Sequence, residues 1–206
     1  VRAGLEMGCE VYGFVQGYTG VLDRHYQVME SSSVSGILHR GGTILKSARC
    51  EEFKTTRGQK EGMEVLEELG LDGLVVIGGD GSLRGANALF ELGMNVVGVP
   101  ATIDNDVCGT DMAIGVDTCL NTITWAIDII KDTASSHERA FIIEVMGRES
   151  GYLAIMSSLS CGAEAAIIPE FSYDLERIGS KLADRFKEGK TDSIILVAEG
   201  AASAYT

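Results

Sequence analysis

Three carboxylates follow two apolar runs of the chain. Asp80 comes shortly after residues 74–77, and Asp104 and Asp106 follow residues 95–99. In parallel sheets, residues that follow neighbouring strands meet at one edge, where ligands bind. One carboxylate there can hold Mg²⁺ beside phosphate oxygens while another accepts a proton from an attacking hydroxyl. These residue types at this spacing are the parts that phosphoryl transfer needs.

Glycines flank the first of these carboxylates. Residues 78–82 read Gly-Gly-Asp-Gly-Ser, and helix-forming residues occupy positions 84–92. Glycines let a ligand approach the backbone N–H groups closely, and the start of the following helix adds partial positive charge. We therefore expect this turn to bind phosphate, with Mg²⁺ between the phosphate and the Asp80 carboxylate.

The elements that position these residues alternate regularly along the chain. Apolar, β-branched runs predict strands at 10–15, 74–77, 95–99, 139–145, 165–168 and 192–198. Segments with helical spacing predict helices at 59–69, 84–92, 115–133, 151–159 and 174–188. The alternation predicts a layered α/β fold with mainly parallel sheets and helices on both faces. We expect Trp125, on the longest helix, to pack rather than to contact a ligand.

Short motifs along nearly the whole chain resemble the 6-phosphofructokinase family. They are GGDGS at 78–82, PATIDND at 100–106, GTD at 109–111, SSHER at 135–139 and EVMGR at 144–148. The resemblance implies a two-lobed, Rossmann-like phosphofructokinase fold. Residues 1–115 would form the nucleotide-binding lobe and 116–206 the sugar-phosphate lobe. Both lobes are expected to be incomplete, because the family's first strand with its GGD-x-PG-x-N turn and its C-terminal part are absent from the sequence.

The resemblance also implies a role for individual residues. The ATP and Mg²⁺ side would comprise Arg49, Cys50, Gly79, Asp80, Gly81 and Ser82, with Asp106 as a further metal ligand. The fructose 6-phosphate side would comprise Thr102, Ile103, Asp104, Arg139, Met146, Gly147, Arg148 and Glu199. Asp104 would take the proton from the 1-hydroxyl, Thr102 would orient the sugar, and Arg148 would stabilise the transferring phosphoryl group. Arg139 would reach a neighbouring subunit's sugar phosphate, which implies a dimer or tetramer with shared sites.

Each of these assignments has a plainer alternative. Asp104, Asn105 and Asp106 could simply form an Asx-type turn. Arg49 could be a solvated surface arginine, Arg148 could form a surface salt bridge, and Glu199 could be a solvated strand end. The resemblance also puts Lys131 and Glu164 where relatives bind a regulatory nucleotide. A lone lysine and a lone glutamate are usually surface charges, so we expect no regulatory site here.

The choice of phosphoryl donor depends on two small residues. Relatives that use pyrophosphate tend to carry Asp at position 81 and Lys at position 101, where this chain has Gly81 and Ala101. Small neutral residues leave room for a nucleotide, so we expect ATP as the donor. The alternatives are a pyrophosphate-dependent enzyme, a NAD or lipid kinase that shares only GGDG, and a non-catalytic regulatory subunit. A non-catalytic subunit would not need the catalytic residues, so their joint presence counts against that alternative. They are Asp80, Thr102, Asp104, Asp106 and Arg148.

Composition excludes other classes of function. The net charge of −13, with no basic stripe to offset it, argues against nucleic-acid binding. No run approaches the roughly 18 apolar residues that a membrane helix needs. The five cysteines are scattered without a CxxC pair, as in a protein whose thiols stay reduced. A cytoplasmic location is therefore expected.

Overall fold

The computed structural model of the chain describes residues 1–201. The chain folds into two compact units. The first comprises Val1–Val76 and Gly81–Val99, and the second comprises Ile77–Asp80 and the chain from Pro100 onward. The assignment of nucleotide binding to residues 1–115 and of sugar-phosphate binding to residues 116–206 stays a prediction.

Short elements and one long helix make up the first part of unit 1. They are α1 (Arg2–Glu6), β1 (Tyr12–Phe14), α2 (Tyr18–Leu22), β2 (Tyr26–Val28), the 3₁₀ turns Ser32–Val34 and Glu52–Lys54, and α3 (Thr56–Glu68). β1 and β2 pair antiparallel. The Thr55 hydroxyl caps α3 by accepting the Gly58 N–H. Val65 and Leu66 are buried on the inner face of α3, against the core of this unit.

The two chemistry-bearing segments follow strands of a three-stranded sheet. Its order is β3 (Leu74–Gly78), β4 (Val96–Thr102) and β5 (Ile114–Gly115), and β4 runs parallel to β5. The expected end of β4 before Pro100 is wrong, because the strand continues to Thr102. Only Ala101 and Thr102 pair with β5, so the missing N–H of Pro100 precedes that ladder.

The connection after β3 is tighter than the sequence predicts. Gly79 alone separates β3 from α4 (Asp80–Glu91), whereas the sequence pattern predicts a five-residue turn and a helix from residue 84. Asp80 belongs to the first helical turn, where a carboxylate is favoured by the partial positive charge of the helix N-terminus. The glycine-rich turn is therefore the start of a helix rather than a separate loop.

Unit 2 contains a second parallel sheet. Its elements are α5 (Val116–His137), β6 (Ala140–Val145), α6 (Tyr152–Cys161), β7 (Ala165–Ile167), α7 (Leu175–Lys187) and β8 (Ser193–Ala198). All pairs in the order β6-β8-β7 are parallel, which confirms the predicted mainly parallel α/β class. Among residues 1–201, no helix has the length and apolar character needed to cross a membrane.

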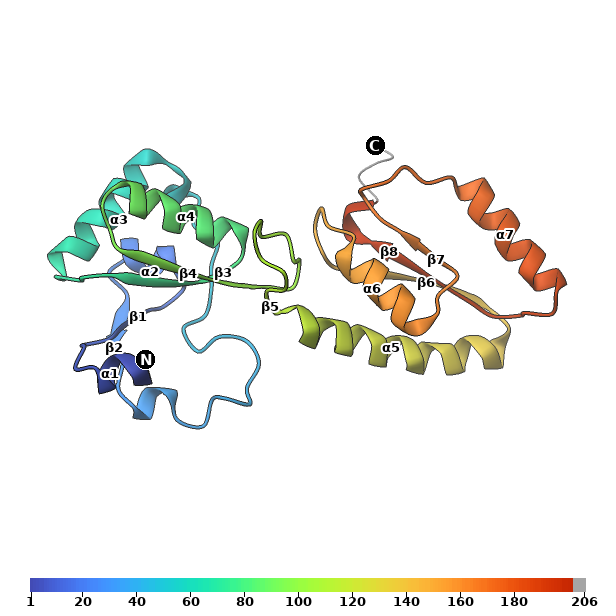
Figure 1. Cartoon of the computed structure of the whole chain (residues 1–206), viewed down its shortest axis with the longest axis horizontal. Helices are drawn as coiled ribbons and strands as arrows, with labels where there is room; N and C mark the ends of the chain where they lie inside the picture. The colour runs from blue at the N-terminus through green and yellow to red at the C-terminus, as the bar shows by residue number, and fades with distance from the viewer. Residues whose placement is uncertain (202–206) are drawn as a thin grey trace. The chain divides into compact units, whose positions relative to one another are not determined.

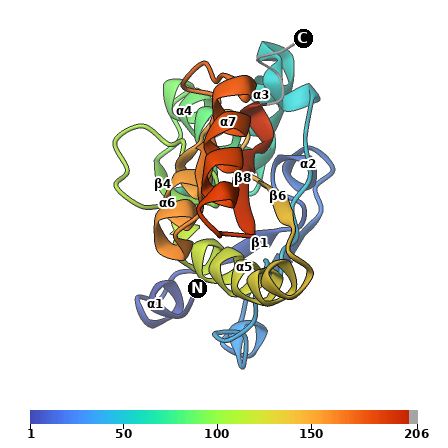
Figure 2. The same cartoon turned by 90° about the vertical axis from the view of Figure 1, so that its right-hand side faces the viewer.

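Helices cover both faces of this sheet (Figure 1). From β6 the chain goes to β7, two positions along the sheet, and it then returns to form β8 between them. Right-handed crossovers in opposite directions place their helices on opposite faces. α5 and α6 pack on one face around Ile127, Leu153 and Leu196. α7 covers the other face with Ile178 and Leu182, and it crosses in front of β8 in Figure 2.

The apolar face of α5 lies where the periodicity predicts it, with one exception. Ile127 is fully buried, and Leu120, Ile123 and Ile130 pack against the same core. Trp125 is 67% exposed, so the expectation that it packs is wrong within this chain. At about 100° per residue, Trp125 lies some 200° around the helix from Ile123, on the opposite face.

Glu164 is buried rather than a surface charge. Its carboxylate accepts the Ile194 N–H at 2.6 Å and pairs with Lys190 and Arg185, while only 3% of its side chain is exposed. Burial alone would raise the pKa of Glu164, but the hydrogen bonds from Lys190 and Ile194 outweigh burial and lower it. Glu164 therefore stabilises the start of β8 at neutral pH, and this stabilisation is lost as the pH falls through its lowered pKa.

Candidate active site

Asp104 lies in the loop after β4, where its side chain is largely buried. Only 7% of the residue is exposed. Its backbone N–H donates to the Thr102 Oγ1 at 3.2 Å, so the last residue of β4 orients the start of the loop. A Cβ on Gly79 would lie 3.2 Å from the Thr102 Cβ, so the end of β3 packs closely here. The two strand ends therefore meet at one edge, as the sequence predicts.

Asn105 closes the loop that carries the two carboxylates. Its backbone is left-handed, with φ of 53°. Its side-chain amide donates to the Asp111 carbonyl at 3.3 Å and accepts the Ala113 N–H at 3.0 Å. Asn tolerates this conformation better than most residues. Among the residues of the possible Asx-type turn, it is therefore the Asn105 side chain that closes the loop.

The carboxylate of Asp104 faces Arg148. The Arg148 Nε lies 3.2 Å from the Asp104 Oδ2, and 60% of the Arg148 side chain remains exposed. Burial raises the pKa of Asp104, and the negative charges of Asp106 and Glu199 raise it further. The positive charge of Arg148 and a hydrogen bond from Thr102 oppose this rise without cancelling it. Asp104 is therefore a stronger proton acceptor than an ordinary exposed carboxylate.

Strand register brings Arg148 and Glu199 to the same edge. Val145, the last residue of β6, pairs with Ala198, the last residue of β8. The segments that follow these two strands therefore start side by side. The Arg148 N–H donates to the Glu199 Oε1 at 2.5 Å. Arg148 does form a salt bridge, as the plainer alternative has it, but with the largely buried carboxylate of Asp104. Glu199 accepts a backbone N–H and is therefore more than a solvated strand end.

The backbone of Arg148 adopts an unusual conformation. Its φ is 51°, and Gly147 before it has φ of 138°. The left-handed region costs a residue with a Cβ about 1–2 kcal/mol. A hydrogen bond to a charged group contributes about 1.5–3 kcal/mol, so the bond that the Arg148 N–H donates to Glu199 is large enough to offset that cost. Met146, 60% exposed, precedes this turn.

Arg139 is not brought to this site. It lies just before β6, at the end of that strand opposite to Arg148. Six residues of strand separate the two ends by roughly 20 Å. The side chain of Arg139 is exposed and cannot join Asp104 within one copy of the chain. The role predicted for Arg139 at a neighbouring subunit stays a prediction.

Tyr18 supports the first turn of α4 within unit 1. Its hydroxyl donates to the Ser82 carbonyl at 2.6 Å, and its ring stacks on Phe53 with centroids 4.0 Å apart. A Cβ on Gly85 would collide with the Tyr18 ring. Burial raises the pKa of the Tyr18 hydroxyl, which keeps it protonated and able to donate. Apart from the aromatic residue itself, no sequence pattern indicates this contact.

The remaining predicted nucleotide-side residues of unit 1 are accessible to different degrees. A Cβ on Gly81 would meet no atom within 4 Å, so neither packing nor backbone strain requires glycine there. Arg49 is exposed on the segment before α3. Cys50 is half-buried and packs against the core of unit 1. The structure therefore gives Cys50 a packing role and leaves Arg49 free to contact a ligand.

Carboxylates alone make up the predicted metal site. Within residues 1–201, no group of three or more His, Cys, Asp or Glu side chains is arranged to hold a metal ion. Mg²⁺ in phosphoryl-transfer sites commonly binds one or two carboxylates together with phosphate oxygens and water. Asp80 in the first turn of α4 and the exposed Asp106 fit that donor set.

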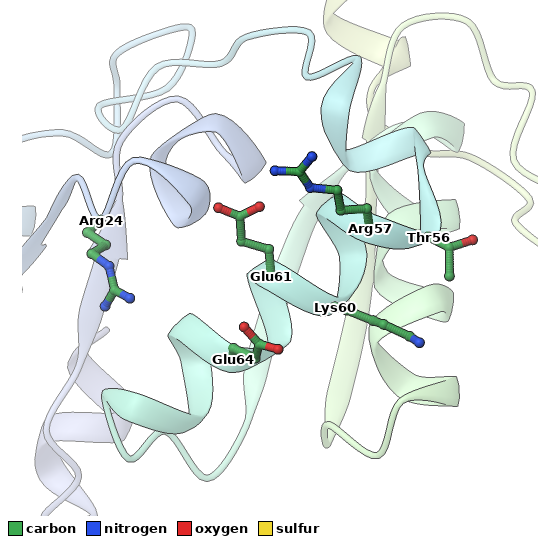
Figure 3. A pocket seen from close by; sticks show the side chains of 6 residues that line it. All are labelled: Arg24, Thr56, Arg57, Lys60, Glu61 and Glu64. Atoms are coloured by element: carbon green, nitrogen blue, oxygen red, sulfur yellow. The ribbon is translucent and has the colours of Figure 1, made fainter.

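A separate hollow along α3 does not have the features of a binding site. Arg24, Thr56, Arg57, Lys60, Glu61 and Glu64 line it. Figure 3 shows Arg57 and Glu61 on the side of α3 toward Arg24, whereas Lys60 points away. Arg24 also pairs with Glu68 at 2.5 Å. The charges are mixed and do not converge on one point.

Fold and site together define a mainly parallel α/β protein in which acidic and basic side chains lie beyond the carboxyl ends of strands. The family model described as phosphofructokinase matches residues 1–206. The chain belongs to the phosphofructokinase family. An ATP-dependent 6-phosphofructokinase of Thermotoga neapolitana is 56% identical over 207 residues, which cover 100% of this chain and 65% of that protein.

Solved structures agree with this family. A Pichia pastoris phosphofructokinase in the T-state matches with a TM-score of 0.90 and 34% identity, covering 98% of this chain and 25% of that one. A pyrophosphate-dependent phosphofructokinase from Nitrosospira multiformis matches with a TM-score of 0.80 and 21% identity, covering 93% of this chain and 52% of that one. At that identity the second likeness concerns the fold alone. The predicted phosphofructokinase fold is confirmed.

Proposed function

We propose that this chain is part of an ATP-dependent 6-phosphofructokinase. The reaction transfers the γ-phosphoryl group of ATP to the 1-hydroxyl of fructose 6-phosphate and gives fructose 1,6-bisphosphate and ADP. The observation that carries the proposal is the buried Asp104 carboxylate, whose pKa is raised and which faces the Arg148 guanidinium. The identity to a named ATP-dependent relative supports the same reaction.

Each residue of the site has a defined part in this reaction. The oxygen of the sugar 1-hydroxyl attacks the γ-phosphorus of ATP while Asp104 accepts the hydroxyl proton. The bond between the γ-phosphorus and the bridging oxygen that leaves with ADP breaks. Arg148 stabilises the negative charge that spreads over the transferring oxygens. Thr102 holds Asp104 in place and, with Ile103, borders the sugar. Met146 and Gly147 contact the sugar by packing and through the backbone.

Asp80 and Asp106 would hold Mg²⁺ on the nucleotide side of the site. The ion supplies charge neutralisation on the phosphate oxygens when it is bound. Gly79, Gly81 and Ser82 offer backbone N–H groups at the start of α4, where anions are favoured. Arg49 would add a planar, multidentate contact to the ATP phosphates.

Initial rates of fructose 1,6-bisphosphate formation by the full-length protein test the proposal. ATP and pyrophosphate are supplied in parallel, each with Mg²⁺ and fructose 6-phosphate. Formation of product with ATP and none with pyrophosphate is the expected result. Product with pyrophosphate alone would favour the pyrophosphate-dependent enzyme, and product with neither donor would favour a non-catalytic subunit.

Replacing Gly81 with aspartate should discriminate against ATP. A carboxylate there would lie close to the nucleotide phosphates, and two like charges about 4 Å apart repel by about 1–4 kcal/mol in water or near a protein surface. The expected result is a loss of roughly tenfold to several hundredfold in kcat/KM for ATP. Thermal unfolding should change little, because a Cβ at Gly81 meets no atom of the chain within 4 Å. Gly81→Asn separates bulk from charge, and equal losses in both variants would contradict the electrostatic argument.

Arg139 would serve the sugar-phosphate site of a second copy, so we infer a homo-oligomer with shared sites. Arg139→Ala and Asp104→Asn are each expected to be nearly inactive. In a mixed symmetric dimer, one of the two sites receives both wild-type residues. Random equal mixing should therefore restore roughly a quarter of wild-type activity. Mixed samples that have reassembled yet show no gain would place Arg139 outside the shared site.

The five cysteines are consistent with a cytoplasmic location, which we infer from their state. All are free: Cys9, Cys50, Cys108, Cys119 and Cys161. Proteins of oxidising compartments usually pair such residues. Thiol titration of the denatured protein, taken from cells with oxidation blocked, should find five free thiols, and fewer would contradict a reducing compartment.

A further inference from the structure

Glu199 bonds to the backbone of Arg148 rather than only to solvent. Its Oε1 accepts the Arg148 N–H at 2.5 Å, and the pairing of Val145 with Ala198 sets the two segments beside each other. A hydrogen bond from a backbone N–H to a carboxylate is charge-assisted and shorter than one between neutral groups. Glu199 therefore fixes the peptide group from which the Arg148 side chain extends.

The turn that presents Arg148 depends on such support. Gly147 and Arg148 both have positive φ, which only the surrounding structure can maintain for an arginine. On the other side of the turn, a Cβ on Gly200 would collide with the Arg148 carbonyl oxygen. The residues directly after β8 thus hold the N–H of Arg148 and pack against its carbonyl. The end of β8 shapes the turn after β6.

We propose that Glu199 is a positioning residue, which acts by fixing the backbone of Arg148 so that its guanidinium stays directed at Asp104 and at the transferring phosphoryl group. The inference rests on the proposed function. It differs from the predicted sugar contact, because the effect of Glu199 passes through Arg148. The second carboxylate oxygen of Glu199 can still accept a sugar hydroxyl.

Steady-state kinetics separate positioning from a sugar contact. Glu199→Ala should lower kcat about tenfold to a hundredfold, because small misplacements of a charge-stabilising group are costly. KM for fructose 6-phosphate should change less than kcat. Glu199→Gln keeps an oxygen that can accept the Arg148 N–H and should recover most of the lost kcat. A residue that contacts only sugar hydroxyls would instead raise KM and leave kcat unchanged.

Glu170 offers a matched control. Its carboxylate accepts the Gly151 N–H at 2.7 Å, three residues after Arg148. Glu170→Ala removes a bond of the same kind from the same segment without touching the Arg148 peptide. We expect its kcat to stay within about threefold of wild type. A loss as large as that of Glu199→Ala would mean that general loosening of the segment explains the effect, which overturns the proposal.

A double-mutant cycle tests whether Glu199 acts through Arg148. In an Arg148→Ala background, Glu199→Ala should cause little further loss of kcat, because the side chain that it positions is already gone. Losses that multiply would show that Glu199 acts independently of Arg148. That outcome would overturn the proposal.

Hydrogen exchange at the Arg148 amide tests the contact without any need for activity. The amide should be protected in wild type and in Glu199→Gln, and should exchange at least about tenfold faster in Glu199→Ala. Unchanged exchange in Glu199→Ala would overturn the proposal even in an active enzyme. If exchange follows this pattern but the protein forms no fructose 1,6-bisphosphate, the contact between Glu199 and Arg148 stands. The catalytic role of that contact is then overturned together with the proposed function.

Discussion

Replacing Asp104 with asparagine should lower kcat by about 10²–10⁴-fold, the range that a general base contributes. Asparagine has nearly the same shape but cannot take a proton from the 1-hydroxyl. Binding of fructose 6-phosphate, measured by calorimetry, should stay within a few-fold of wild type. Asp132→Asn, an exposed aspartate on α5, is the matched control and should behave like wild type. A variant that turns over normally would show that Asp104 is not the base.

The same variant should be more stable than wild type at neutral pH. The pKa of Asp104 is raised on folding, so the folded state disfavours the ionised carboxylate. The contribution of Asp104 to stability is present below its unfolded pKa and is lost as the pH rises through its folded value. Thermal unfolding with chelator present should show a gain for Asp104→Asn at pH 7 that disappears in acid. A loss of stability at pH 7 would mean that the Arg148 ion pair outweighs burial.

Replacing Arg148 with alanine should lower kcat by about 10²–10³-fold, as expected when a group that stabilises transition-state charge is removed. Arg148→Lys should recover only part of this loss. Lysine keeps the positive charge but not the planar group whose Nε lies 3.2 Å from the Asp104 Oδ2. Arg177→Ala, an exposed arginine on α7, is the control for loss of a surface charge.

The Arg148 prediction has a second, independent readout. The guanidinium helps to hold Asp104 ionised, so its loss should raise the pKa of Asp104 further and move the acid limb of the activity profile to higher pH. Full recovery of kcat by Arg148→Lys would show that only the positive charge matters and not the planar guanidinium. An acid limb that does not move in Arg148→Ala would show that Arg148 does not act on Asp104.

Local patterns predict the parts of the fold that depend on periodicity. The apolar spacing of α5 identifies Ile127 as a core residue, and the alternation of strands and helices identifies the parallel sheets. Patterns fail where another element decides the outcome. Pro100 reads as a strand end, yet the neighbouring strand β5 pairs with the two residues after it. Glu164 reads as a surface charge, yet Lys190 and the Ile194 N–H meet it from far along the chain.

The candidate site shows the same limit. Residue types and spacing predict a carboxylate base beyond β4, and the resemblance to the family selects Asp104 for it. Residue types and spacing place Asp80 in a turn, whereas it belongs to the first turn of α4. They allow an Asx-type turn at 104–106 but do not reveal that Asn105 closes it, because its partners Asp111 and Ala113 are defined only once the loop folds. Nor do they reveal the bond from Arg148 to Glu199, which depends on the register between β6 and β8.

Transfer of label from ATP tests the central claim most directly. Full-length protein is given ATP carrying isotopic label in the γ-phosphoryl group, together with fructose 6-phosphate and Mg²⁺, and the products are followed by ³¹P NMR. The account predicts that the label appears in the phosphate on carbon 1 of fructose 1,6-bisphosphate, and that Asp104→Asn slows this transfer by about 10²–10⁴-fold. Label that appears only in inorganic phosphate, or that stays in ATP, would contradict it.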